Sequence, residues 1–146
     1  MVIADDTVMR ILGGPLNGMR WIKGSHNLSN LFGAYETEQT AHFIKQIADS
    51  AVFWDLGAHV GHYSLAYSRY SNGFLYAFEP EKRNYELLEK HFKLNGLTKY
   101  KIMQAAVSDK NRIMHFKKTA SSVAGKLADE GDVEVQALSL SALLRE

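Results

Sequence analysis

Apolar residues recur along the chain in patterns that predict alternating strands and helices. Three apolar stretches are predicted to be strands: 52–56, 73–80 and 100–107. Three segments before or between these strands are predicted to be helices: 35–50, 62–71 and 81–94. Because strands and helices alternate, the pattern predicts an α/β domain built on a parallel sheet.

Shorter elements are expected on either side of this alternating region. Turn signals at Gly13-Gly14-Pro15 predict a hairpin over 8–23, which we expect to cover an edge of the sheet. Ser139 is expected to cap a helix that starts near Leu140. Before that helix, the pattern predicts two short strands, 113–117 and 133–136. The segment between them, 119–132, is predicted to be a loop that is able to lie over the site. We expect one domain spanning 1–146.

The clearest chemical signal is the turn after the first strand. An apolar run ends in Asp55, and Gly57 and Gly61 follow before a helix. Glycine lets the backbone turn sharply and come within contact distance of a ligand. The first N–H groups of the next helix, together with its dipole, favour an anionic group such as a carboxylate. The turn therefore predicts a nucleotide-type ligand site.

The second strand places another carboxylate at the same edge of the sheet. Glu79 follows Asp55 at about the distance that a strand, turn, helix and strand need. A carboxylate at the tip of this strand can accept hydrogen bonds from both hydroxyls of a ribose. We therefore predict that Glu79 is the ribose ligand.

The glycine spacing separates two classes of nucleotide. A dinucleotide fold uses Gly-x-Gly-x-x-Gly, but here His59 occupies the second glycine position and Asp55 precedes the turn. A pyrophosphate would meet a side chain and a negative charge. Asp-x-Gly-x-x-x-Gly instead suits a ligand with a cationic amino-acid end, such as S-adenosylmethionine. A dinucleotide-binding oxidoreductase module is kept as a distant alternative.

Four blocks of residues resemble, in order, the motifs of FkbM-type S-adenosylmethionine-dependent methyltransferases: 55–64, 77–80, 94–97 and 106–109. The segment 14–22 resembles the lead-in hairpin of the same family. The resemblance implies a Rossmann-like class I methyltransferase sheet with flanking helices and a cofactor-binding core at 51–107. The implied reaction is O-methylation of a hydroxyl on a sugar or small metabolite.

The turn chemistry and the resemblance together give the expected cofactor-binding residues: Asp55, Gly57, Ala58, His59, Gly61, Tyr63, Glu79, Pro80 and Ala106. By resemblance, the backbone near Ala106 meets the adenine ring, and Tyr63 and Ser64 border the methionine moiety. Burial against the sheet explains Tyr63 equally well. Tyr35 and Glu36 are weaker candidates for the methionine end, because a solvated glutamate in the first turn of a helix is ordinary.

The composition excludes several other functions. A net charge of +1 over 146 residues gives no footprint for nucleic acid or for an anionic membrane, and no apolar run is long enough to span one. Without cysteine there is no thiol nucleophile or cysteine-bound zinc. His59 and His62 lack a third ligand at metal spacing, so no metal is predicted. A cytoplasmic location is the default expectation.

The C-terminal end departs from the family pattern. In the family, a segment like 137–144 leads into further strands, and without them strand 52–56 is expected to be an unpaired sheet edge. We therefore expect a partial domain that associates, as a homodimer, through this edge. No catalytic residue is assigned, and His62 is a candidate base only because it lies near the turn. A cofactor-binding but inactive fragment is the main alternative to an active enzyme with a small-molecule hydroxyl acceptor.

Overall fold

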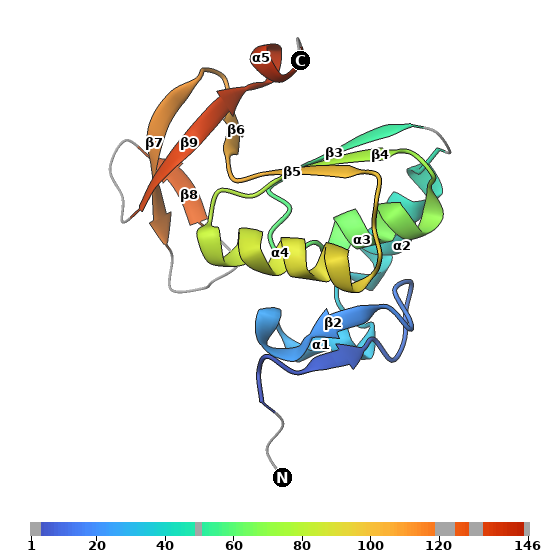
Figure 1. Cartoon of the computed structure of the whole chain (residues 1–146). Coiled ribbons are helices and arrows are strands. Elements are labelled where there is room, and N and C mark those ends of the chain that lie inside the picture. Colours follow the sequence, from blue (N-terminus) through green and yellow to red (C-terminus); the bar gives the residue numbers. More distant parts are fainter. Residues whose placement is uncertain (1–3, 49–50, 119–124, 129–132, 145–146) are drawn as a thin grey trace.

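The computed structural model describes residues 4–48, 51–118, 125–128 and 133–144 (Figure 1). Its strands are β1 (Val8–Arg10), β2 (Arg20–Ile22), β3 (Val52–Leu56), β4 (Phe74–Phe78), β5 (Tyr100–Met103), β6 (Ala106–Ser108), β7 (Arg112–Lys118), β8 (Gly125–Ala128) and β9 (Val133–Ser139). Its helices are α1 (Leu28–Phe32), α2 (Thr37–Gln46), α3 (His62–Tyr70), α4 (Lys82–Leu94), α5 (Leu140–Leu143) and the 3₁₀ helix η1 (Lys23–Ser25). Within these residues, no helix combines the length and apolar character needed to cross a membrane.

A parallel sheet in the order β3-β4-β5 forms the centre of the molecule. The register pairs Val52 with Phe74 at one end of β3 and Leu56 with Phe78 at the other. Parallel neighbours need a crossover connection, which α3 supplies between β3 and β4 and α4 supplies between β4 and β5. This arrangement confirms the predicted α/β fold class.

One face of the central sheet is covered by α2, α3 and α4 (Figure 1). Its core contains fully buried apolar side chains from both layers, including Leu65, Leu75, Leu88 and Phe92. Burial of each such side chain contributes about 1.5–3 kcal/mol to folding. The core therefore fixes the strand ends that carry the predicted site.

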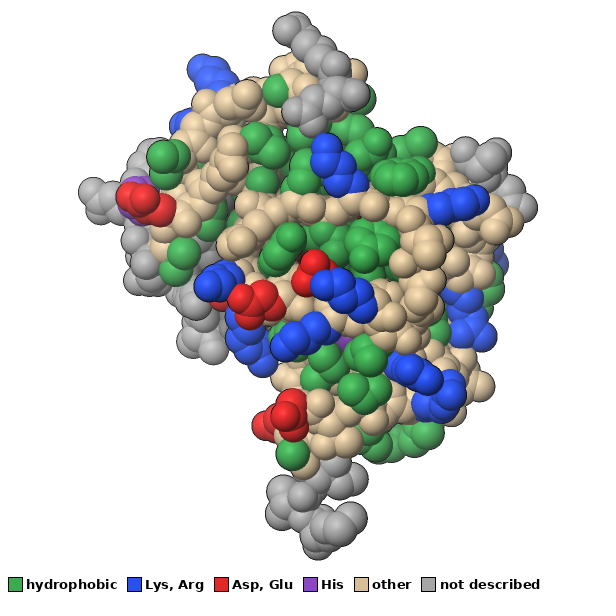
Figure 2. All heavy atoms as spheres, in the orientation of Figure 1, with side chains coloured by type: hydrophobic (Ala, Val, Ile, Leu, Met, Phe, Trp, Pro, Cys, Tyr) green, Lys and Arg blue, Asp and Glu red, His purple; other side chains and the backbone are tan. Residues whose placement is uncertain are grey.

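The opposite face of this sheet carries aromatic residues, with the rings of Trp54 and Tyr76 5.3 Å apart. Hydrophobic side chains are visible along the upper side of the sheet in Figure 2. Among the described strands, β3 pairs with β4 alone. Its end residues Val52 and Leu56 are 57% and 51% exposed, so β3 is an apolar sheet edge, as expected from the sequence.

The prediction of one strand over 100–107 is wrong. The chain leaves the central sheet after Met103, and β6 starts at Ala106 in a second sheet with the order β6-β9-β7-β8. There Ala106 pairs with Ala137 of β9 in parallel and packs in a small core with Met114 and Val135. Only one polar residue, Gln104, separates the apolar residues on the two sides of the break, so hydrophobic patterning alone does not reveal it.

The C-terminal region also differs from its predicted strands and loop. Strand β9 runs to Ser139, beyond the predicted 133–136. Of the predicted loop 119–132, residues 119–124 and 129–132 lie outside the described residues, and 125–128 form β8. The predicted cap is confirmed, because Ser139 Oγ accepts a hydrogen bond from the Ala142 N–H at 3.2 Å.

The N-terminal strands β1 and β2 pair antiparallel, with Val8 opposite Ile22. They lie against α4 (Figure 1), not along an edge of the central sheet, so the expected position of the hairpin is wrong. The contact is specific because the Trp21 ring stacks on His91 of α4, with ring centroids 4.2 Å apart. The hairpin thereby packs on the side of α4 that faces away from the central sheet (Figure 1).

Two helices differ from the predicted pattern. Helix α1 was missed, although Asn27 caps it by accepting from the Ser29 N–H at 3.1 Å and Gly33 ends it in the left-handed region. Helix α2 is shorter than the predicted 35–50 and follows Glu36, whose φ of 42° is outside the helical region. Residues 49–50 lie outside the described ones.

Candidate cofactor site

The turn between β3 and α3 is held on the end of β4 by its own backbone. The N–H groups of Gly57 and Ala58 both donate to the carbonyl oxygen of Phe78, each at 2.9 Å. Three turn residues have positive φ: Gly57 at 86°, His59 at 50° and Gly61 at 97°. The turn thus has the tight shape that the glycine spacing predicted.

The two glycines of the turn have different surroundings. A Cβ added to Gly57 would meet no atom within 4 Å, so the space beside it is open to a ligand. A Cβ added to Gly61 would lie 2.6 Å from Leu88 Cδ1 and 3.3 Å from Phe92 Cε1 of α4. Gly61 therefore allows the turn to pack closely on α4, whereas Gly57 leaves room at the site.

Glu79 connects the tip of β4 to the same turn and is only 5% exposed. Its carboxylate accepts hydrogen bonds from the N–H of His59 at 2.8 Å and from the N–H of Glu81 at 3.0 Å. Burial raises the pKa of Glu79, and these N–H donors act in the opposite direction. The predicted ribose ligand therefore also fixes the conformation of the turn.

Asp55, at the other strand tip, is hydrogen bonded to α3. Ser64 Oγ donates to Asp55 Oδ2 at 2.6 Å. Burial raises the pKa of Asp55, whereas the bonds from Ser64 lower it. A carboxylate is thus held beside the turn with one hydroxyl partner.

A cavity of about 190 Å³ lies beside the turn. Five predicted site residues line it: Asp55, Gly57, Ala58, His59 and Tyr63. The other four do not: Gly61, Glu79, Pro80 and Ala106. Ala106 is buried in the core of the second sheet, whereas Glu79 reaches the turn through the His59 N–H. The remaining lining residues include Tyr35 and Glu36, the weaker sequence candidates.

A chain of hydrogen bonds that the sequence did not predict joins four side chains at the cavity. His26 Nδ1 lies 2.6 Å from Asn30 Oδ1, and Asn30 Nδ2 lies 3.3 Å from His62 Nδ1. His62 Nε2 in turn lies 2.9 Å from Thr40 Oγ1. Burial lowers the pKa of His62 to about 4, although the Glu36 carboxylate raises it and His26 lowers it further. His62 is neutral and paired on both nitrogens, which makes it a poor base.

Glu36 holds the tyrosines on the other side of the cavity. Tyr63 Oη donates to Glu36 Oε2 at 2.6 Å. Burial, with the Glu36 carboxylate, raises the pKa of Tyr35 and of Tyr63 to about 12. Both phenols therefore stay protonated near neutral pH and act as hydrogen-bond donors.

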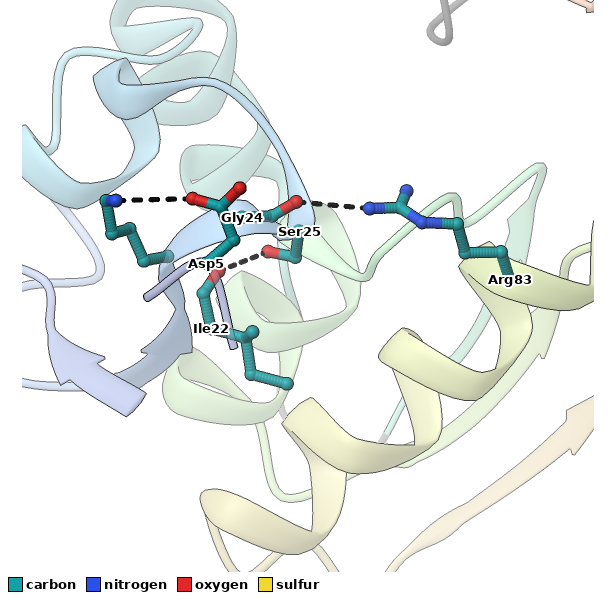
Figure 3. Close-up of polar contacts among 6 residues, drawn as sticks. Asp5, Ile22, Gly24, Ser25 and Arg83 are labelled. Atoms are coloured by element: carbon teal, nitrogen blue, oxygen red, sulfur yellow. Dashed lines mark hydrogen bonds and ion pairs between the residues drawn. The ribbon is translucent and has the colours of Figure 1, made fainter. Parts of the chain in front are cut away.

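The loop that carries His26 is fixed by contacts with the N-terminus and α4 (Figure 3). Lys23 Nζ lies 3.2 Å from Asp5 Oδ1, and Ser25 Oγ donates to the Ile22 carbonyl at 2.7 Å. Arg83 of α4 donates to the Gly24 carbonyl at 3.2 Å. His26 is thereby brought to the turn, with its ring centroid 5.0 Å from that of His59.

The acceptor groups that line the cavity suit a cationic ligand group. The lining includes two carboxylates, Asp55 and Glu36, and contains neither lysine nor arginine. A carboxylate-lined cavity favours a cationic group. Beside it, Gly57 offers the open space that a ligand backbone or ring needs. In the described residues, no group of three histidines or carboxylates is arranged to hold a metal ion.

The sequence did not single out three residues of the site. His26 and Asn30 line the cavity, and Thr40 is hydrogen bonded to His62. The helix signals at Asn27 and Gly33 would have placed α1, but they do not show which residues it faces. His26 reaches the site through the loop between β2 and α1. No spacing rule links this loop to the glycine turn, because the contact is made only by tertiary packing.

The fold is similar to those of solved structures. PH0793 and TYW2 in complex with MeSAdo, both from Pyrococcus horikoshii, each match at 17% identity over 70% of this chain and 37% of theirs, with a TM-score of 0.54. Precorrin-6y C5,15-methyltransferase from Geobacter metallireducens matches at 22% identity over 49% of this chain and 39% of its own, with a TM-score of 0.45.

These comparisons concern the fold. A scan against protein-family models found no match, and a search of the curated proteins found none. The chain spans 37% of the length of the two Pyrococcus proteins. The likeness to them agrees with the observed topology, a Rossmann-like sheet with flanking helices.

Proposed function

We propose that this chain binds S-adenosylmethionine and belongs to a methyltransferase of the FkbM type that acts on a hydroxyl group. The observation that carries the proposal is the carboxylate-lined cavity beside the open Gly57 turn, next to the buried Glu79. The four motif blocks support the family. The likeness in fold to TYW2, solved in complex with MeSAdo, supports a ligand of this chemical class.

Different residues would contact different parts of the cofactor. Glu79 would accept hydrogen bonds from the ribose, and its bonds to the turn would keep the carboxylate in place. Asp55 and Glu36 would face the cationic amino-acid end. Ala106 stays the proposed neighbour of adenine. When bound, S-adenosylmethionine supplies a methyl group on a cationic sulfur.

Transfer to a hydroxyl requires an acceptor oxygen held in line with that methyl group and a base to take the proton. We assign no base, and we propose a sugar or small metabolite as the hydroxyl acceptor. A cytoplasmic location is proposed as well. The acceptor site is not placed among the described residues.

Isothermal titration with S-adenosylhomocysteine tests the proposal. We expect the wild-type chain to bind and Glu79→Ala to bind at least tenfold more weakly, because a charged hydrogen bond contributes about 1.5–3 kcal/mol. Glu86→Ala, on the exposed side of α4, is the control and should bind like the wild type. Circular dichroism shows whether each variant is folded. No binding by the folded wild-type chain would contradict the proposal.

A second proposal is a cofactor-binding chain without activity that associates through β3. It is favoured by the exposed ends of β3, which lacks a second partner among the described strands. Analytical ultracentrifugation should then show a homodimer, and Val52→Lys should shift it towards monomer. Turnover of labelled cofactor would favour the enzyme. Binding of NAD in place of S-adenosylhomocysteine would instead select the distant alternative, an oxidoreductase module.

A further inference from the structure

The hydrogen-bond chain at the cavity fixes the protonation of two histidine rings. Asn30 Oδ1 only accepts, so His26 Nδ1, 2.6 Å away, carries a proton. Asn30 Nδ2 donates to His62 Nδ1, and His62 Nε2 therefore carries the proton of that ring and faces Thr40 Oγ1. In their neutral forms the two rings are thus opposite tautomers, with the proton on Nδ1 in His26 and on Nε2 in His62. The remaining nitrogen of this His26 tautomer, Nε2, is an acceptor.

This acceptor is unpaired. His26 Nε2 is a buried side-chain atom with no hydrogen-bond partner in the described part of the chain. Leaving a buried polar atom without a partner costs about 1–3 kcal/mol, and such atoms in folded proteins call for a specific explanation. His26 also lines the cavity, so a ligand in the cavity is the simplest partner.

In each of the two carboxylates at the cavity, one oxygen already accepts a hydrogen bond from a protein hydroxyl. Asp55 Oδ2 accepts from Ser64, and Glu36 Oε2 accepts from Tyr63. Their charges favour a cation in the cavity, and His26 Nε2 adds an acceptor that has no protein donor among the described residues. An ammonium group has three N–H donors and suits all three acceptors.

We propose that His26 recognises the amino group of the methionine moiety, with Nε2 accepting a hydrogen bond from the ammonium. This assignment rests on the proposed function, and it adds a specificity residue from the N-terminal region to the site. Asn30 is a positioning residue, because its amide sets the tautomer that leaves Nε2 bare. The site then selects S-adenosylhomocysteine over an analogue that lacks the amino group.

Titration calorimetry with S-adenosylhomocysteine and its deamino analogue tests the assignment. The wild-type chain is expected to prefer S-adenosylhomocysteine by at least tenfold. His26→Asn keeps a polar group near Nδ1 but removes the Nε2 position, so the preference should fall severalfold, to the part that the Asp55 and Glu36 carboxylates supply. His26→Gln extends an amide oxygen towards the Nε2 position and should lose less of the preference. His42→Asn, exposed on α2, is the matched control and should behave like the wild type.

Two results would overturn different claims. If the wild-type chain binds neither compound, the proposed function fails and the assignment of His26 fails with it. If the wild-type chain binds S-adenosylhomocysteine and the folded His26→Asn variant keeps the full preference for it, only the assignment fails.

Nitrogen NMR of the wild-type chain gives a readout that does not depend on any variant folding. In the free protein the His26 ring should be protonated on Nδ1 and the His62 ring on Nε2. On addition of S-adenosylhomocysteine, the His26 Nε2 resonance should shift as it gains a donor, and the deamino analogue should leave it in place. An Nε2-protonated His26, or equal shifts with both compounds, would overturn the assignment.

Discussion

His91, which packs against the hairpin, and His26, which lines the cavity, differ in how many of their ring nitrogens are hydrogen bonded. His91 is fully buried, donates from Nδ1 to the Val60 carbonyl at 2.7 Å and accepts at Nε2 from the Ile22 N–H at 3.0 Å. His26 is paired at Nδ1 alone. A saturated buried histidine serves the fold, whereas the unsaturated one marks a place for a ligand.

The hydrogen bonds of His91 also help to place His26. Val60 belongs to the glycine turn and Ile22 ends β2, so His91 ties the turn to the strand that precedes the His26 loop. Each of these bonds joins parts of the chain far apart in sequence. The structural histidine therefore positions the proposed ligand-binding one, and substitutions at the two sites should have opposite signatures in stability and binding.

The largest effect is expected for His91→Phe. The phenyl ring keeps the stacking area against Trp21 but leaves the Ile22 N–H and the Val60 carbonyl buried without partners. We expect a loss of roughly 2–5 kcal/mol in the free energy of unfolding, measured by urea denaturation. His26→Phe should lose less, roughly 1–3 kcal/mol, because it breaks one hydrogen bond, from Nδ1 to Asn30 Oδ1, and Nε2 has no protein bond to break. Equal losses would remove the distinction between the two histidines.

Acid should destabilise the fold through its buried histidines. Burial lowers the pKa of both His62 and His91 to about 4, from 6.5. Between these values the unfolded chain binds more protons, so stability is complete above pH 6.5 and falls as the pH approaches 4. The expected loss at pH 5 is roughly 2 kcal/mol for each histidine.

Urea denaturation of the wild type and of His91→Phe between pH 7.5 and 4.5 measures this dependence. The raised pKa values of Asp55 and Glu79 act in the opposite direction, but both proteins share these carboxylates. His91→Phe should show about half of the pH-dependent loss in the free energy of unfolding that His62 and His91 together cause in the wild type. Parallel curves would show that His91 does not resist protonation.

The glycines of the turn extend the same comparison between fold and site. Gly61→Ala places a Cβ 2.6 Å from Leu88 at a φ of 97°, so we expect a loss of roughly 2–3 kcal/mol in stability. Gly57→Ala shares the unfavourable φ, at 86°, but meets no atom. It should lose only about 1 kcal/mol while weakening the binding of S-adenosylhomocysteine. Thermal denaturation and calorimetry together separate the two effects.

The sequence predicted the parts of the site that are local in the chain. The glycine turn, Asp55 and Glu79 lie at strand tips, and a parallel sheet brings such tips to one edge. The break between β5 and β6 was missed because Ala105 and Ala106 continue the apolar run into a second sheet. His26 and His91 were missed as well, because their roles depend on which loop packs against which helix.

The smallest effect is expected at the hydrogen bond between Ser64 and Asp55 beside the glycine turn. Ser64→Ala removes the hydroxyl that donates to Asp55 at 2.6 Å. The Asp55 carboxylate would lose one donor, and its pKa, already raised by burial, would rise further. We expect a loss of about 1 kcal/mol at pH 7, measured by urea denaturation. Ser68→Ala, whose hydroxyl only donates to a backbone carbonyl within α3, is the control. If Ser64→Ala is no less stable than this control, the Asp55 carboxylate is satisfied without Ser64 and is open to the ligand.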